Sequence, residues 1–227
     1  MLNELCLHKD FKDLPKIFSK DDLELMLCTL KNSDDYLKNV WGDFLKARDK
    51  CIVLLLYALG LRPKECLYLK FNDFDFEGWT IYINGENNKE KKSREVPITK
   101  DVATALKEYL AYPKSLWNGS DYIFPSFEDR TRPLSPGRWK GILREKILKP
   151  AGLYVKGKTK SYTFRSTKAT ELLDSSRDPY LVASFLGHAD LRNLNRYILK
   201  TKFYRERIRK ELNKLQTLNK LVVVQNG

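Results

Sequence analysis

The apolar residues of this chain recur with the period of a helix along almost its whole length and switch to the period of a strand only once. The helical period predicts helices over residues 19–30, 43–60, 63–70, 101–111, 136–147, 165–176, 178–186 and 191–215. Two strands, 79–84 and 95–98, are predicted on either side of the basic turn GENNKEKKSR. The expected fold class is therefore α+β, mostly helical with one small antiparallel β-element.

Composition excludes several classes of protein. The chain has 227 residues, of which 42% are hydrophobic, enough to bury a sizeable core. Its longest apolar run, Cys51–Leu59, is far shorter than the roughly 20 residues of a membrane span, and the N-terminus has no signal-peptide core. The cysteines form no CxxC pair, and Cys28, Cys51 and Cys66 lie in apolar stretches that predict burial. We expect a cytoplasmic protein without a cofactor or a metal site.

The net charge of +13 is confined to one half of the chain. Residues 1–100 hold 17 basic and 17 acidic residues, whereas residues 101–227 hold 25 basic and 12 acidic ones. Such an imbalance favours a surface that binds a polyanion, because each Lys or Arg that neutralises a phosphate releases counterions. A solubilising basic face is the alternative. A membrane surface is not favoured, because no basic helix carries an apolar Trp/Phe/Leu face.

Four short motifs follow one another along the chain. They are ALGLRPKE at 58–65, KEKKSREVPI at 89–98, SYTFR at 161–165, and FLGH at 185–188 with NRYI at 195–198. His188 lies 23 residues after Arg165 and nine residues before Tyr197. Any one of these motifs alone is weak, but their order and spacing together are specific.

The set resembles the catalytic domain of the tyrosine recombinases, the phage integrase family, over about residues 14–203. The resemblance implies a mostly helical catalytic domain that spans residues 1–227 as a single domain. It also implies a site-specific recombinase or integrase that cuts and rejoins double-stranded DNA through a 3′-phosphotyrosine intermediate, without a cofactor. The resemblance further implies a protein of a mobile genetic element that assembles as a dimer or tetramer on DNA.

The resemblance assigns a catalytic set, whose members are Arg62, Lys92, Tyr162, Arg165, His188 and Tyr197. Two guanidiniums can grip the non-bridging oxygens of a phosphate and stabilise the charge that develops there. A phenol attacks phosphorus, and a lysine on a turn can give a proton to the leaving 5′-oxygen. Lys92 fits the pattern K-x-R-x-V-P-I best, with Lys91 and Lys89 as alternatives, and His188 is expected to hydrogen-bond the phosphate.

The sequence departs from the family pattern in two places. Tyr162 stands where the family has a histidine, which leaves a hydrogen-bond donor but removes a group that titrates near neutral pH. No N-terminal core-binding domain is seen, so the chain is either a catalytic fragment or a naturally short recombinase. Residues 204–227 are expected to form a C-terminal helix and tail, either exchanged between protomers or packed on their own domain.

Each assignment has a plainer alternative. Arg62 could form a surface ion pair with Glu65, Arg165 could be a solvent-facing residue at a helix start, and Tyr162 could pack in the core. Lys92 could belong to a solvated charge run, His188 could be an ordinary turn residue, and Tyr204 is a rival nucleophile. Glu65 is expected to orient Arg62.

At the level of function, the alternatives are a relaxing enzyme similar to type IB topoisomerases and an inactive DNA-binding regulator.

Overall fold

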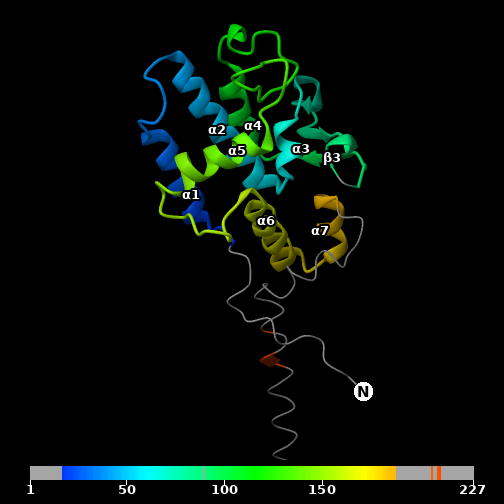
Figure 1. Cartoon of the computed structure of the whole chain (residues 1–227). Coiled ribbons are helices and arrows are strands. Elements are labelled where there is room, and N and C mark those ends of the chain that lie inside the picture. Colours follow the sequence, from blue (N-terminus) through cyan, green and yellow to red (C-terminus); the bar gives the residue numbers. More distant parts are fainter. Residues whose placement is uncertain (1–16, 89, 188–205, 207–208, 211–227) are drawn as a thin grey trace, which may run out of the picture. The chain divides into compact units, whose positions relative to one another are not determined.

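The computed structural model describes residues 17–88, 90–187, 206 and 209–210. The chain divides into two compact units, residues 1–168 and 169–227, and the boundary falls within a helix. A single domain over the whole chain stays a prediction. The α-helices are α1 (Lys20–Asn32), α2 (Val40–Leu59), α3 (Pro63–Leu67), α4 (Lys100–Leu110), α5 (Pro136–Ile142), α6 (Ser161–Ser176) and α7 (Pro179–Leu186) (Figure 1).

The predicted helix boundaries have clear physical causes at α1 and α2. Ser19 caps α1, because its side chain accepts a hydrogen bond from the Asp22 amide and the Asp22 carboxylate accepts one from the Ser19 amide. Gly60 ends α2 in the left-handed conformation, with φ 60°, and its amide donates to the Leu56 carbonyl at 3.1 Å. A residue with a side chain would be strained there, so the chain turns at Gly60 towards α3.

The core of the first unit is built on α2, which packs against α4 (Figure 1). An aromatic group joins the two helices to the segment that follows α4. The rings of Phe44 and Tyr109 are stacked with centroids 5.1 Å apart, and the Trp117 ring meets Phe44 edge-on at 4.9 Å. The Tyr109 hydroxyl and the Trp117 indole both donate to the Ile123 carbonyl, at 2.8 and 3.0 Å, so these buried polar atoms are satisfied.

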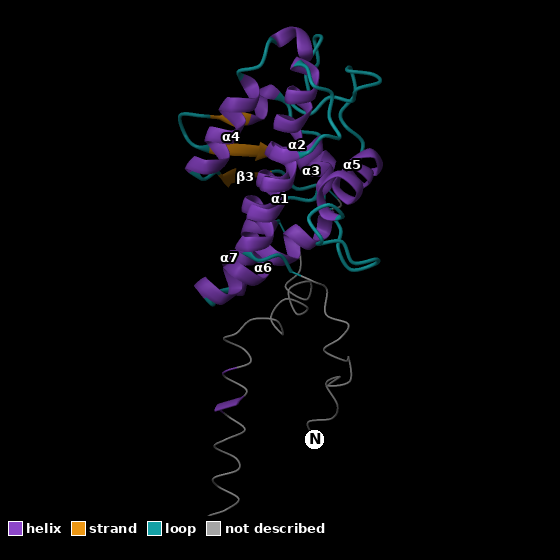
Figure 2. Cartoon of the chain, turned by 90° about the vertical axis from the view of Figure 1, so that its left-hand side faces the viewer, coloured by secondary structure: helices purple, strands orange, loops and turns teal. Residues whose placement is uncertain are grey.

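The β-element is a three-stranded antiparallel sheet in the order β1 (Phe74–Asp75), β2 (Thr80–Ile83), β3 (Arg94–Pro97) (Figure 2). Ile81 of β2 pairs with Val96 of β3, and both side chains are buried. The sequence predicted β2 and β3 but not β1, because two residues are too few to show an alternation. The fold class is confirmed as α+β, mostly helical with a small antiparallel sheet.

Two further expectations about elements need correction. The predicted helix 165–176 begins earlier, at Ser161, so that residues 162 and 165 lie in its first turns. The predicted helix 136–147 changes after α5 into a π-helix, η5 (Leu143–Leu148). Both differences lie at positions where hydrophobic period alone does not determine the hydrogen-bonding pattern.

The cysteines also divide differently from the prediction. Cys51 and Cys66 are buried, which raises the pKa of both thiols, but Cys28 is exposed. The expectation of a buried Cys28 was wrong because its position on α1 faces solvent, whereas Met26 and Leu30 face the core.

The second unit is described as far as Gly187, apart from three later residues. Its apolar cluster joins the end of α6 to α7 through Ala169, Leu173, Val182, Ala183 and Leu186. Asp178 caps α7 by accepting from the amides of Tyr180 and Leu181, and Gly187 ends it with φ 66°. Within the described ranges, each helix is too short or too polar to serve as a membrane span.

Candidate active site

Arg62 lies at the point where the chain turns from α2 into α3. It is the N-cap residue of α3, and Pro63 begins that helix. The Glu65 carboxylate accepts from the Arg62 amide at 2.8 Å and from Arg62 Nη1 at 2.9 Å. The two side chains are only 11% and 0% exposed, so the alternative of a surface ion pair does not hold. As expected, Glu65 orients Arg62.

Glu65 is shared with a second arginine. β3 lies beside α3 (Figure 1), and Arg94 of β3 donates from Nη1 and Nη2 to the two Glu65 oxygens at 2.9 and 3.1 Å. Burial alone would raise the pKa of Glu65. The hydrogen bonds and charge of Arg94, the amide of Arg62 and the charge of Arg165 outweigh that effect, so the pKa of Glu65 lies below its usual value.

Arg165 reaches the same region from the first turns of α6. Its Nη1 donates to the Gly60 carbonyl at 3.0 Å, and the residue is 2% exposed. The solvent-facing alternative for Arg165 therefore does not hold. The charge of Arg165 helps to lower the pKa of Glu65. Three guanidiniums therefore gather around one buried carboxylate: those of Arg62, Arg94 and Arg165.

The β2–β3 turn (residues 84–93) carries the candidate lysine. The Asn88 side chain holds the Lys92 backbone at both ends: Nδ2 donates to the Lys92 carbonyl at 3.0 Å, and Oδ1 accepts from the Lys92 amide at 3.4 Å. Gly85 packs so tightly against this backbone that a Cβ atom there would lie 2.7 Å from the Lys91 carbonyl carbon. Lys91 itself has a left-handed φ of 49°. The side chains of Lys91 and Lys92 are exposed, on a turn whose backbone is held in place.

The same turn also carries an acid, Glu90, that contacts Arg62. Glu90 Oε1 accepts from Arg62 Nη2 at 2.6 Å, and the Glu90 side chain is 18% exposed. Its other oxygen, Oε2, is buried and accepts no hydrogen bond from any described residue. Arg62 therefore lies between two carboxylates, with Glu65 on Nη1 and Glu90 on Nη2.

Of the remaining predicted catalytic residues, Tyr162 is described, whereas His188 and Tyr197 are not. Tyr162 lies in the first turn of α6 and is 52% exposed, so the alternative of a core tyrosine does not hold. His188, Tyr197 and the rival Tyr204 lie outside the described residues, as do Lys89 and the predicted helix 191–215 apart from residues 206, 209 and 210. The roles of all six predicted catalytic residues stay predictions.

Sequence reasoning gave no role to Arg94 or Glu90. Arg94 stands two residues before buried Val96, so the strand alternation predicts that the two side chains share one face of β3. Glu90 is an acid inside an otherwise basic run, which is a weak signal. In both cases the partner lies 28 or 29 residues away, so only the folded chain reveals the contact.

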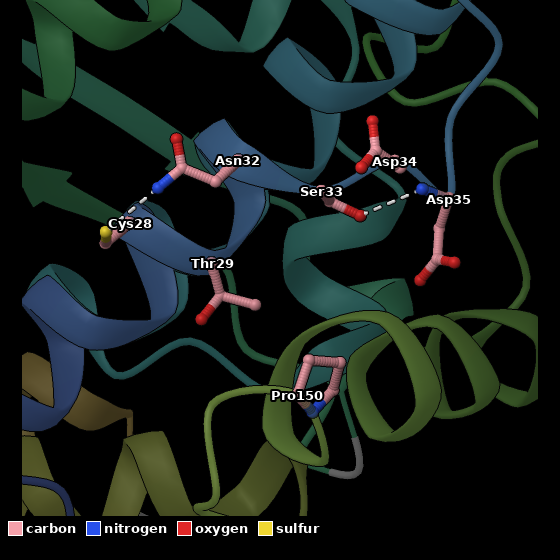
Figure 3. A pocket seen from close by; sticks show the side chains of 7 residues that line it. All are labelled: Cys28, Thr29, Asn32, Ser33, Asp34, Asp35 and Pro150. Atoms are coloured by element: carbon pink, nitrogen blue, oxygen red, sulfur yellow. Dashed lines mark hydrogen bonds between the residues drawn. The ribbon is translucent and has the colours of Figure 1, made fainter.

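The structure also has a pocket away from these arginines. It is lined by Thr29, Asn32, Ser33 and Pro150, among others, and the Asn32 side chain donates to Cys28 Sγ at 3.3 Å (Figure 3). None of its lining residues belongs to the arginine cluster, so it is no part of the candidate site. Among the described residues, no group of three or more His, Cys, Asp or Glu side chains is arranged to hold a metal ion.

Comparison with known proteins identifies the family. The model of the phage integrase family matches residues 17–202, which include all six predicted catalytic positions. The chain belongs to the phage integrase family. The resemblance inferred from the order and spacing of the four motifs is thereby confirmed at the level of the family.

Curated tyrosine recombinases are among its relatives. XerA of Pyrococcus horikoshii is 31% identical over 201 residues, which are 88% of this chain and 62% of that protein. XerD of Listeria innocua is 32% identical over 200 residues, covering 86% of this chain and 61% of that protein. This chain therefore spans about three fifths of the length of the curated relatives that it matches.

Solved structures show the same fold. The XerH site-specific recombinase, in a post-cleavage complex with its palindromic difH substrate, superimposes with a TM-score of 0.70 and 25% identity, covering 87% of this chain and 53% of that one. The XerA recombinase has a TM-score of 0.63 at 23% identity, covering 82% and 59%. These likenesses support the tyrosine-recombinase fold for this member of the family.

Proposed function

We propose that this chain is the catalytic part of a site-specific recombinase or integrase that cuts and rejoins double-stranded DNA through a 3′-phosphotyrosine intermediate. The observation that carries the proposal is the cluster of Arg62, Arg94 and Arg165 around Glu65. Guanidiniums gathered in one place form a binding site for an anion, because each can donate two parallel hydrogen bonds to the oxygens of a phosphate. A DNA phosphate supplies that anion.

The two arginines of the family motif would bind the scissile phosphate. Arg62 is oriented by Glu65, and Arg165 by the Gly60 carbonyl, so neither side chain needs to be ordered when the substrate arrives. As the phosphorus becomes five-coordinate, negative charge grows on its non-bridging oxygens. Guanidiniums held in place beforehand stabilise that charge without reorganisation.

In the reaction, Tyr197 Oη forms a bond to phosphorus while the bond between phosphorus and the 5′-oxygen breaks. The phenol gives up its proton to a base, and the 5′-oxygen takes one from Lys92, or from Lys91 or Lys89, on the β2–β3 turn. His188 hydrogen-bonds the phosphate. The phosphotyrosine keeps the energy of the phosphodiester, so a free 5′-hydroxyl can reverse the step and rejoin a strand.

Tyr162 takes the place of the family histidine in this scheme. Half exposed at the start of α6, three residues before Arg165, it can donate a hydrogen bond to a phosphate oxygen. A phenol hydroxyl is a hydrogen-bond donor, so we assign Tyr162 a donor role and not that of a base.

The proposal extends to the setting of the reaction. The partner is double-stranded DNA, bound by the basic half of the chain, and the protein acts as a dimer or tetramer on that DNA in the cytoplasm. Residues 204–227 are proposed to be exchanged between protomers. Strand exchange of this kind serves the movement of a mobile genetic element.

The test is covalent capture on nicked duplexes. A pool of duplexes with a randomised central sequence and a nick next to each possible cleavage position is incubated with the full chain. Loss of the short nicked fragment traps the 3′-phosphotyrosine, and a denaturing gel separates the adduct from free protein. The captured DNA is sequenced to read the target site, and peptide mapping identifies the linked residue. We expect the adduct on Tyr197.

Matched variants make the result specific. Tyr197→Phe should abolish the adduct while leaving DNA affinity within a few-fold of the parent, and Tyr204→Phe should retain it. An adduct on Tyr204 would overturn the assignment of the nucleophile. DNA binding without any adduct would favour the inactive regulator, and relaxation of supercoiled plasmid without recombination would favour the topoisomerase-like enzyme.

A further inference from the structure

We propose that, when DNA is absent, the Glu90 carboxylate occupies the position on Arg62 where the scissile phosphate binds. The phosphate displaces Glu90 and thereby releases the β2–β3 turn. The inference rests on the proposed function, because it concerns the same arginine. It assigns to Glu90 a positioning role that the family motifs do not contain.

The two carboxylates on Arg62 are bound very unequally. Glu65 is fully buried and accepts from the Arg62 amide, from Arg62 Nη1 and from both Nη atoms of Arg94. Glu90 accepts through Oε1 alone, from Arg62 Nη2 at 2.6 Å, and its Oε2 has no donor among the described residues. An incoming anion that competes for Arg62 therefore replaces Glu90 and leaves Glu65 in place.

The unpartnered oxygen of Glu90 shows that the carboxylate is an imperfect occupant. Oε2 is buried, yet no described residue donates to it. A buried acceptor without a donor loses its hydration and gains nothing in return. A phosphodiester has two non-bridging oxygens in a tetrahedral arrangement, so it can reach donors that a planar carboxylate held from one side cannot.

Charge balance favours the same exchange. Around Arg62 the described groups are three guanidiniums and two carboxylates, those of Glu65 and Glu90. If Glu90 left without a replacement, Arg62 would lose the negative charge that it contacts at Nη2. A phosphodiester carries one negative charge, as the Glu90 carboxylate does, so the exchange keeps the balance unchanged.

The exchange is coupled to the candidate lysines through the turn. Glu90 lies between Asn88 and Lys92, whose backbone and side-chain hydrogen bonds close a small loop. While Glu90 is bound to Arg62, that loop is tied to the arginine cluster. Once phosphate replaces Glu90, the loop is free to move, and Lys91 and Lys92 can approach the leaving oxygen. Proton delivery then depends on the presence of substrate.

The first experiment measures anion binding and needs no cognate DNA. Inorganic phosphate is titrated into the full ¹⁵N-labelled chain, and its affinity is read from the Nε–Hε signals of the arginine side chains. Glu90→Gln keeps the shape of the side chain but weakens its grip on Arg62. Since a hydrogen bond between charged groups is worth more than a neutral one, phosphate should bind Glu90→Gln about tenfold more tightly than the parent.

The matched control is Glu86→Gln, which removes the same charge from an exposed position on the same turn. It should change the phosphate affinity less than about twofold, because an exposed charge is screened by solvent and salt. The double variant Arg62→Gln with Glu90→Gln should not show the increased phosphate affinity of Glu90→Gln alone. If Glu90→Gln binds phosphate no more tightly than the parent, Glu90 merely supports Arg62 and the proposal fails.

The second experiment follows the turn itself by hydrogen–deuterium exchange and mass spectrometry. Saturating phosphate should speed exchange in the peptide that covers residues 84–93 of the parent, up to the rate in Glu90→Gln without phosphate. Phosphate should add nothing further in Glu90→Gln. Protection of this peptide by phosphate, or no change in the parent, would contradict release of the turn.

These outcomes separate the inference from the proposed function. If an adduct forms on DNA but Glu90→Gln does not bind phosphate more tightly than the parent, the role of Glu90 is disproved and the recombinase proposal stands. If Glu90→Gln binds phosphate more tightly but no DNA yields an adduct, Glu90 keeps its role at an anion site and the proposed strand-transfer reaction is disproved.

Discussion

At the scale of single residues, the site depends on how Arg62 and Arg165 are held. Both side chains are oriented by protein groups before any substrate binds, Arg62 by Glu65 and Arg165 by the Gly60 carbonyl. Pre-orientation of this kind matters for the transition state more than for binding, because the charge that the guanidiniums meet develops during the reaction.

We therefore expect Arg62→Ala and Arg165→Ala to slow covalent cleavage by about 10²–10³-fold while DNA affinity changes little. Cleavage is measured as single-turnover adduct formation on a captured nicked duplex. Arg138→Ala removes an exposed arginine of α5 and serves as the matched control, with cleavage at the parent rate. Parent-like cleavage by either of the first two variants would show that its arginine is structural.

Glu65 makes stability depend on pH. Its pKa in the folded chain is lower than the unfolded value of about 4.5, because Arg94, Arg62 and Arg165 favour the carboxylate. The group contributes stability that is fully present above the unfolded pKa and is lost as pH falls through the folded pKa. Replacing it removes one partner of a buried ion pair with Arg62 and Arg94, a change that typically costs about 3–5 kcal/mol.

Glu65→Gln should accordingly lower the free energy of unfolding by about 3–5 kcal/mol at neutral pH, measured by urea denaturation. The difference from the parent should begin to shrink as pH falls below about 4.5, where the unfolded parent binds a proton at Glu65. It should keep shrinking down to the lower folded pKa, where the native carboxylate is protonated too. Glu95→Gln, at an exposed position of β3, should have little effect at any pH. A difference that stays constant across the acid range would mean that the Glu65 charge contributes nothing.

At the scale of elements, the β2–β3 turn combines a held backbone with the exposed side chains of Lys91 and Lys92. Asn88 closes the loop around Lys92, and Gly85 permits the Lys91–Lys92 backbone to lie against it. Two features of this turn were readable from the sequence: its flanking strands and its basic composition. The close approach at Gly85 was not, because it joins residues that are separated by the whole turn.

Gly85→Ala should therefore distort the turn. A Cβ atom 2.7 Å from backbone forces a shift, and overpacking of this kind costs about 1–3 kcal/mol of unfolding free energy. Cleavage should fall further than stability suggests, since Lys92 moves with the backbone. Gly141→Ala is the matched control: nothing lies within 4 Å of its added Cβ in α5, so it should raise stability by about 0.5–1 kcal/mol. Equal behaviour of the two variants would disprove the tight packing at Gly85.

At the scale of the whole molecule, charge sets how the protein meets DNA. The net charge of +13 lies wholly in residues 101–227, so phosphate contacts should be concentrated there. Affinity for a duplex of arbitrary sequence, followed by fluorescence anisotropy, should fall about 10³-fold or more between about 50 and 200 mM salt if six or more phosphates are contacted. A flat dependence would exclude phosphates as the main contact.

Paired variants locate the binding surface. Replacing the exposed Lys140 and Lys156 by Gln should weaken binding and flatten the salt dependence more than the same change at the exposed Lys20 and Lys31. The two doubles remove equal charge, so any difference reports position. An equal loss in both would favour a diffuse basic coat over a binding surface in the second half of the chain.

The sequence by itself determined those features that depend on near neighbours in the chain. Helix period indicates α1 and α2, the Ser19 cap determines where α1 begins and the Gly60 turn where α2 ends, and alternation determines β2 and β3. The order and spacing of the motifs identified the family and its candidate arginines, because the chemistry of phosphate transfer demands guanidiniums at those positions.

Only the tertiary structure decided which groups those arginines meet. Glu65 is shared by Arg62 and Arg94. Glu90 contacts Arg62, which is 28 residues away in the sequence, and Arg165 contacts the Gly60 carbonyl, which is 105 residues away. Such contacts arise when α3, β3 and α6 pack around one place, and no local pattern encodes them. The physical reason is that a buried charge must find its partner wherever the packed chain places one.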